Sequence, residues 1–182
     1  MLALKIKVLK EIYECIDAQF TVTHTSLAKP TCMQDPIFTH LHTVSFSETD
    51  MAGIVHFSNY FKWMEAAEHA LLKDLGLPLF TQNESIFYGW PRVRASCAYH
   101  APLRFEDKIA IRVFITDLLP RAVRYKFIFH KKDNNETIKV ATGELSTVFS
   151  EFHIKDRSLR PSSLEAKALE CLEAYAKQCR AS

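Results

Sequence analysis

The sequence predicts an α+β domain in which one curved antiparallel sheet wraps around a long helix. Three observations predict this class: a β-rich segment comes first, a helix with a broad apolar face follows, and four strand segments come last, two of them with apolar residues at every second position. Period two is typical of strands with one buried face, and a wide apolar stripe indicates a helix covered by other elements. A sheet folded around the helix buries both kinds of surface.

The first strand is predicted at residues 37–46 and the helix at residues 60–75. Gly76 and Pro78 follow the helix, as expected where a helix ends. The apolar face of this helix comprises Tyr60, Met64, Ala67, Leu71 and Leu75.

The second run of strands is separated by short polar turns. The turns are predicted at residues 119–121 and 133–135, and the four strands at residues 92–101, 108–118, 122–132 and 137–149.

The chain is expected to carry additions at both ends of a domain spanning residues 37–150. Residues 1–36 form an N-terminal extension, with helical spacing of apolar residues at 2–20 followed by a linker composition. Residues 151–182 are predicted to contain an amphipathic helix. Ser162 and Glu165 form a capping-box pattern at its expected start.

Composition excludes several classes of protein. The 182 residues include 13 Phe and only 4 Gly and carry a net charge of +2, which argues against disorder and against a glycine-rich nucleotide loop. No apolar run reaches the length of a membrane span, and the first residues lack a secretory pattern, so we expect a cytoplasmic protein. We expect the five dispersed cysteines to be free thiols: Cys15, Cys32, Cys97, Cys171 and Cys179.

Residues 46–64 are the most informative stretch. A strand end is followed by a loop with one carboxylate, Asp50, and then by the start of the apolar helix. Unpaired N–H groups at a helix start carry partial positive charge, so this order can place a carboxylate beside oxyanion donors. Gly53 would let the loop turn and let a substrate approach the backbone. The pattern favours hydrolysis of an activated acyl group, although Asp50 could also simply cap the turn.

This stretch resembles the signature of the 4-hydroxybenzoyl-CoA thioesterase family of hotdog-fold proteins. The family pattern Asp-x-x-Gly-Ile/Val-Val is matched by Asp50 to Val55, and its Asn-Tyr by Asn59 and Tyr60. The resemblance covers about residues 37–150. It implies a hotdog fold, a catalytic Asp50 acting as nucleophile or general base, and an oxyanion donor in the N–H of Phe57.

Other polar residues are weaker candidates. His56 could bond Asp50 or the leaving thiolate, but the histidine of many relatives is one position later, at Phe57. Glu65 is a reserve carboxylate on the helix, whereas Glu48 is expected to be solvated and Glu68 to lie on the polar strip of the helix. His40 and His42 lack a third ligand at metal-site spacing, so no metal is expected.

The segment of residues 92–132 holds ten Lys or Arg and three Asp or Glu. This excess could reflect solvated strand faces or a surface for the phosphates of coenzyme A. Arg121 and Arg124 are the candidates for phosphate binding. The resemblance also implies a homodimer or homotetramer, which would cover exposed sheet edges.

The predicted reaction is therefore hydrolysis of an acyl-CoA thioester to a free acid and coenzyme A, with no cofactor. One alternative is a hotdog dehydratase acting on a hydroxyacyl thioester, but the Asp-x-Asn-Pro-x-His pattern of that subgroup is absent. Another is a non-catalytic acyl-thioester binding protein. Neither a nucleic-acid motif nor the identity of the acyl group can be read from the sequence, and an acyl carrier protein could replace coenzyme A.

Overall fold

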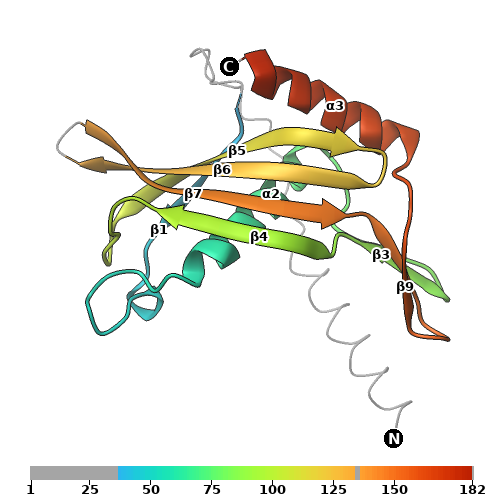
Figure 1. Cartoon of the computed structure of the whole chain (residues 1–182), viewed down its shortest axis with the longest axis horizontal. Coiled ribbons are helices and arrows are strands. Elements are labelled where there is room, and N and C mark those ends of the chain that lie inside the picture. Colours follow the sequence, from blue (N-terminus) through green and yellow to red (C-terminus); the bar gives the residue numbers. More distant parts are fainter. Residues whose placement is uncertain (1–36, 134–135, 182) are drawn as a thin grey trace, which may run out of the picture. The chain divides into compact units, whose positions relative to one another are not determined.

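The computed structural model describes residues 37–133 and 136–181. The helix predicted at residues 2–20, Cys15 and Cys32, and part of the turn at 133–135 lie outside the described residues. Within them, one long helix lies against a five-stranded antiparallel sheet, and a smaller sheet extends from one end (Figure 1). The predicted α+β class and the helix packed on a curved antiparallel sheet are confirmed.

The large sheet has the strand order β1-β5-β6-β7-β4, so β1 and β4 form its two edges. The predicted strands are present with small shifts at their ends. Their bounds are β1 Thr39–Thr43, β4 Arg92–Tyr99, β5 Lys108–Leu119, β6 Ala122–Asp133 and β7 Glu136–Val148.

Helix α2, Asn59–Asp74, is the predicted long helix, and its apolar face packs on the inner face of the sheet. At Gly143 of β7, an added side-chain carbon would overlap the sulfur of Met64. Any other residue here would force the Met64 side chain to move, so the glycine favours this close packing. Fully buried residues of β5 and β6 form the other wall of the core: Ile109, Ile111, Val113, Ile115, Val123, Tyr125, Phe127 and Phe129.

The second sheet, of four short strands in the order β2-β3-β8-β9, was not predicted. Strands β3 and β8 continue the β4–β7 pair beyond a bend at Trp90-Pro91 and Phe149, because Gly89 pairs with Ser150. Strands of two to four residues are too short to show a period, which explains why the sequence pattern missed them. Their bounds are β2 Thr81–Gln82, β3 Ile86–Gly89, β8 Ser150–His153 and β9 Ser158–Pro161.

The C-terminal helix α3, Ala166–Ala181, begins later than its capping-box pattern indicated. The Leu169 N–H donates to the Glu165 carbonyl, so Glu165 is the residue that caps the helix start, and the predicted start at Ser162 is wrong. The Ser162 N–H instead donates to Phe149, which keeps this segment extended along the sheet. Helix α3 then packs over β5 (Figure 1), where the Tyr175 hydroxyl donates to the Val113 carbonyl at 2.6 Å.

Candidate active site

The loop between β1 and α2 is a closed turn. A short 3-10 helix η1, Phe46–Glu48, leads into it, and a bridge between Thr49 and Val55 closes its neck. Inside, the Asp50 N–H donates to Ile54 and the Gly53 N–H donates to Asp50. Gly53 has a φ of 69°, in the left-handed region that favours glycine. This glycine lets the loop reverse direction beside Asp50.

Asp50 is exposed, and its carboxylate has two different environments. Its Oδ1 accepts the Ala52 N–H at 2.8 Å, which is the turn-capping contact considered from the sequence. Its Oδ2 has no hydrogen bond within the described residues. The turn therefore orients the carboxylate while leaving one oxygen for another group.

The N–H of Phe57 is unpaired within the described part of the chain. Phe57 lies just before α2, and the first backbone hydrogen bond after it is the Asn59 N–H donating to the His56 carbonyl. Amides at this position point along the helix axis away from the helix, with partial positive charge. Such a donor can bind a carbonyl oxygen that becomes negative.

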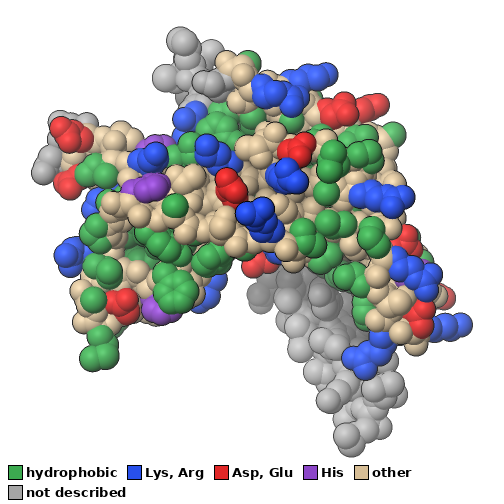
Figure 2. All heavy atoms as spheres, in the orientation of Figure 1, with side chains coloured by type: hydrophobic (Ala, Val, Ile, Leu, Met, Phe, Trp, Pro, Cys, Tyr) green, Lys and Arg blue, Asp and Glu red, His purple; other side chains and the backbone are tan. Residues whose placement is uncertain are grey.

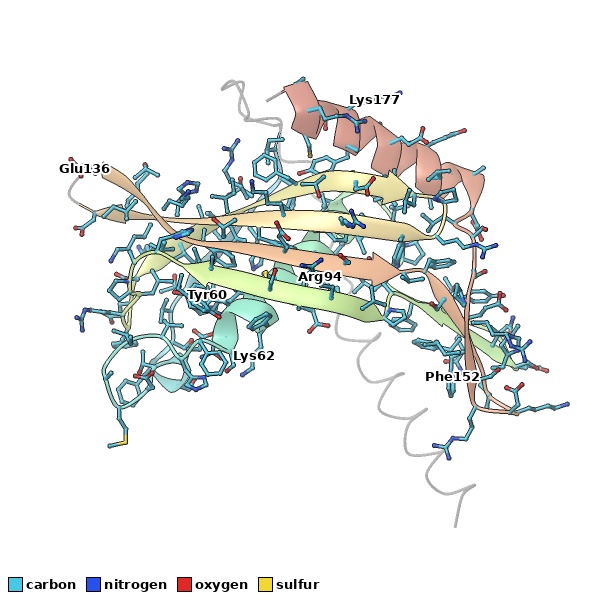
Figure 3. The ribbon with its side chains drawn as sticks, viewed as in Figure 1. Tyr60, Lys62, Arg94, Glu136, Phe152 and Lys177 are labelled. Carbon is cyan, nitrogen blue, oxygen red and sulfur yellow. The ribbon has the colours of Figure 1, made fainter. Side chains whose placement is uncertain are left out.

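Asp50 and Phe57 lie in the wall of the same groove, which has a volume of about 400 Å³. The opposite wall comes from the end of β4 and the residues after it. Figure 3 shows Tyr60 beneath this end of β4 and Phe152 at the other end of the molecule. The lining is mostly apolar and includes Val55, Tyr60, Tyr99, His100, Pro102 and Leu103. A larger cleft of about 680 Å³, beside β1 and the start of β5, contains none of the predicted site residues.

His56 does not contact Asp50. Its Nδ1 lies 2.8 Å from the Ser58 hydroxyl, and its ring packs on the Phe57 ring with centroids 4.4 Å apart. Glu65, the reserve carboxylate, lies outside the groove and contacts Arg92 at 3.2 Å. The structure thus brings Asp50, Gly53 and Phe57 together and leaves these two side chains to other contacts.

Arg121 and Arg124 lie at the far end of β6 from the groove. Tyr60 in the groove contacts Phe129, whereas the two arginines flank the β5–β6 turn. The Arg124 guanidinium lies 3.2 Å from Asp117, and the Arg121 Nε donates to Ser163 at 3.4 Å. Basic side chains are spread over the outer face of the sheet among acidic ones (Figure 2). One chain therefore does not place these arginines near its own Asp50.

Glu48 is an anchor of the Asp50 loop, so the expectation that it is solvated was wrong. Its Oε1 accepts the Trp63 indole N–H at 2.7 Å. Its Oε2 accepts the Ser45 N–H at 2.7 Å and lies 3.0 Å from His42 Nε2. Burial favours the neutral acid, but these hydrogen bonds together outweigh it and lower the pKa of Glu48. The loop is thereby tied to β1 and α2.

The expectation for Glu68 was also wrong, because this residue is fully buried instead of lying on the polar strip. Its Oε2 lies 2.7 Å from the Arg92 guanidinium, while its Oε1 has no hydrogen bond within the described residues. Neither glutamate was identifiable from spacing alone, because their partners come from other elements.

No three His, Cys, Asp or Glu side chains among the described residues lie close enough together to hold a metal ion. The described cysteines Cys97, Cys171 and Cys179 are free thiols. Neither described helix is long and apolar enough to cross a membrane.

Comparison with known proteins gives one consistent family. Residues 44–168 match the family model described as the thioesterase-like superfamily. A 1,4-dihydroxy-2-naphthoyl-CoA hydrolase of Crocosphaera subtropica is 30% identical over 105 residues, covering 57% of this chain and 77% of that protein. A 4-hydroxybenzoyl-CoA thioesterase of Pseudomonas sp. strain CBS-3 is 30% identical over 76 residues, covering 41% and 54%. The solved structure of a gentisyl-coenzyme A thioesterase aligns with a TM-score of 0.59 at 28% identity, covering 74% and 98%.

Proposed function

We propose that this chain, which belongs to the thioesterase-like superfamily, hydrolyses an acyl-coenzyme A thioester to a carboxylic acid and coenzyme A. The observation that carries this proposal is the shared groove of Asp50 and Phe57. Among the described residues, a carboxylate oxygen and an amide that have no hydrogen-bond partner line one small volume at the start of α2. Ester or thioester hydrolysis needs both kinds of group.

In the proposed mechanism the thioester carbonyl oxygen accepts the Phe57 N–H. Asp50 Oδ2 then acts in one of two ways. As a nucleophile it attacks the carbonyl carbon and expels the coenzyme A thiolate, and water hydrolyses the resulting acyl-Asp50 anhydride to the free acid; as a general base it removes a proton from an attacking water and passes that proton to the leaving thiolate. Negative charge gathers on the carbonyl oxygen in the transition state, and one such donor is worth about 2.7–4 kcal/mol. We propose no cofactor, since the steps use only these two groups, and coenzyme A enters as part of the substrate.

We also propose that the protein acts as a homodimer or homotetramer in the cytoplasm. Strand β4 is a free edge of the large sheet and is mostly exposed, with Val93 64% exposed. An uncovered edge strand favours pairing with a second copy. In such an assembly Arg121 and Arg124 would be offered to the phosphates of a coenzyme A bound at another copy's groove. The free thiols are consistent with a reducing compartment.

We retain residues 37–150 as the catalytic domain, with the C-terminal helix as an addition. Residue 150 is the first residue of β8, so this proposed boundary falls within the small sheet.

Release of free thiol from a panel of aliphatic and aromatic acyl-CoAs tests the proposal. We expect Asp50→Asn to lower the rate by at least about 100-fold, the usual scale for loss of a general base. Asp74→Asn, an exposed acid at the end of α2, is the matched control and should retain the wild-type rate. Undiminished hydrolysis by Asp50→Asn would remove Asp50 from the mechanism, and no release from any substrate would contradict the hydrolase.

A further inference from the structure

We infer that Tyr99 is a positioning residue, whose hydroxyl holds the peptide turn that presents the Phe57 N–H to the substrate. The inference rests on the hydrolysis proposed above. It assigns a function to a residue that lines the groove but has no part in the chemistry itself.

The contact is specific. Tyr99 is the last residue of β4, and its hydroxyl donates to the Phe57 carbonyl at 3.3 Å. Within the described part of the chain this is the single hydrogen bond of the Phe57 backbone, because the Phe57 N–H has no partner. The Tyr99 hydroxyl therefore links the Phe57 backbone to strand β4.

Contact with the Tyr60 ring fixes the orientation of the Tyr99 ring. It meets the Tyr60 ring edge-on with centroids 5.0 Å apart, and Tyr60 packs in the same way on Phe129 at 5.4 Å. Tyr60 is 3% exposed and so forms a rigid support. Burial raises the pKa of Tyr99, and the nearby Cys97 thiol is the second cause.

A donor for a developing oxyanion works only when it is held in the right direction. Rotation about the Phe57 backbone would turn its N–H away from the groove, and a displacement of about 1 Å can cost about 100-fold in rate. The carbonyl held by Tyr99 and the N–H offered to substrate belong to the same residue. Loss of the hydroxyl should therefore affect turnover more than substrate affinity.

The kinetic test is Tyr99→Phe, which keeps the ring and removes the hydroxyl. We expect kcat to fall about tenfold, on the scale of one hydrogen bond, with KM unchanged within about twofold. Tyr88→Phe is the matched control, because Tyr88 lies in the small sheet, stacked on Phe149 at 6.1 Å. It should keep wild-type kcat. An unchanged kcat in Tyr99→Phe would overturn the inference.

A second measurement does not depend on activity. Labelling with carbonyl-¹³C phenylalanine and ¹⁵N serine makes only Phe–Ser peptide bonds visible in an HNCO spectrum, and the chain has three, at Phe46, Phe57 and Phe149. Ser58→Ala identifies the Phe57 signal by removing it. Tyr99→Phe should shift the carbonyl resonance of this signal, and Tyr88→Phe should leave it in place.

The two readouts separate the possible failures. A wild-type protein that releases no thiol, together with a shifted Phe57 signal, would contradict the proposed function but keep the tether. An active wild type with an unmoved Phe57 signal in Tyr99→Phe would contradict the tether while leaving the hydrolase intact.

Discussion

Two glutamates differ in how their carboxylates are paired: Glu48 in the loop before α2, and Glu68 within α2. Glu48, at the loop end, is 18% exposed and accepts three hydrogen bonds with its two oxygens. Glu68, in the middle of the helix, is 0% exposed and keeps one oxygen without a hydrogen bond in the described structure. The same side chain is therefore fully satisfied in one place and half satisfied in the other.

The pKa values of Glu48 and Glu68 shift in opposite directions. Several donors lower the pKa of Glu48 despite partial burial. Burial raises the pKa of Glu68 to about 7, and the Arg92 cation offsets only part of this effect. Glu68 is buried more deeply and has fewer donors than Glu48, and a single short ion pair does not offset that burial. The loop that carries Asp50 is held by the carboxylate that stays ionised.

The largest expected effect comes from removing the partner of Glu68. Arg92→Met at pH 8 leaves a buried carboxylate without its cation and should lower the free energy of unfolding by about 3–5 kcal/mol. Urea denaturation measures it, with Arg94→Met on the same strand as the control (Figure 3). At pH 5, where Glu68 is protonated, the loss should be smaller. An equal loss at both pH values would show that the carboxylate charge is not the cause.

The next effect is the pH dependence that Glu68 imposes. Its pKa is raised from an ordinary 4.5 to about 7, so the folded state binds the proton more tightly. This stabilisation is complete below pH 4.5 and is lost as the pH rises to about 7, by about 3 kcal/mol. Glu68→Gln should flatten stability over this window, whereas Glu65→Gln on the exposed side of α2 should not. An unchanged pH profile in Glu68→Gln would assign the slope to other groups.

The smallest effect on stability is expected at Glu48. Glu48→Ala leaves the Trp63 indole N–H unpaired and should cost about 1–3 kcal/mol at pH 7. Because the pKa of Glu48 is lowered, its contribution is present above about pH 4.5 and is lost as the pH falls through the folded value. Glu151→Ala removes a similar His–Glu contact in β8 and is the control. Glu48→Ala should lower both the thermal unfolding temperature and the rate of thiol release. A wild-type rate of thiol release would mean that the Asp50 loop does not need this anchor.

Much of the fold was predictable because it depends on local periodicity. The strands of the large sheet and α2 repeat every two or about 3.6 residues, and Asp50 and Phe57 are close in sequence, so their proximity follows from one short loop. The Glu48–Trp63 contact and the burial of Glu68 could not be predicted in this way. They depend on how α2 is rotated against strands that are distant in sequence. The distance of Arg121 from Asp50 likewise depends on strand direction, which composition does not reveal.

The fit of Met64 over Gly143 has a chemical consequence. The sulfur of Met64 is buried against Gly143 of β7, so a sulfoxide there would place a polar oxygen inside the apolar core. Because Met64 is fully buried, we expect peroxide to oxidise its thioether only when the core opens locally, so the oxidation rate would report how often that opening occurs.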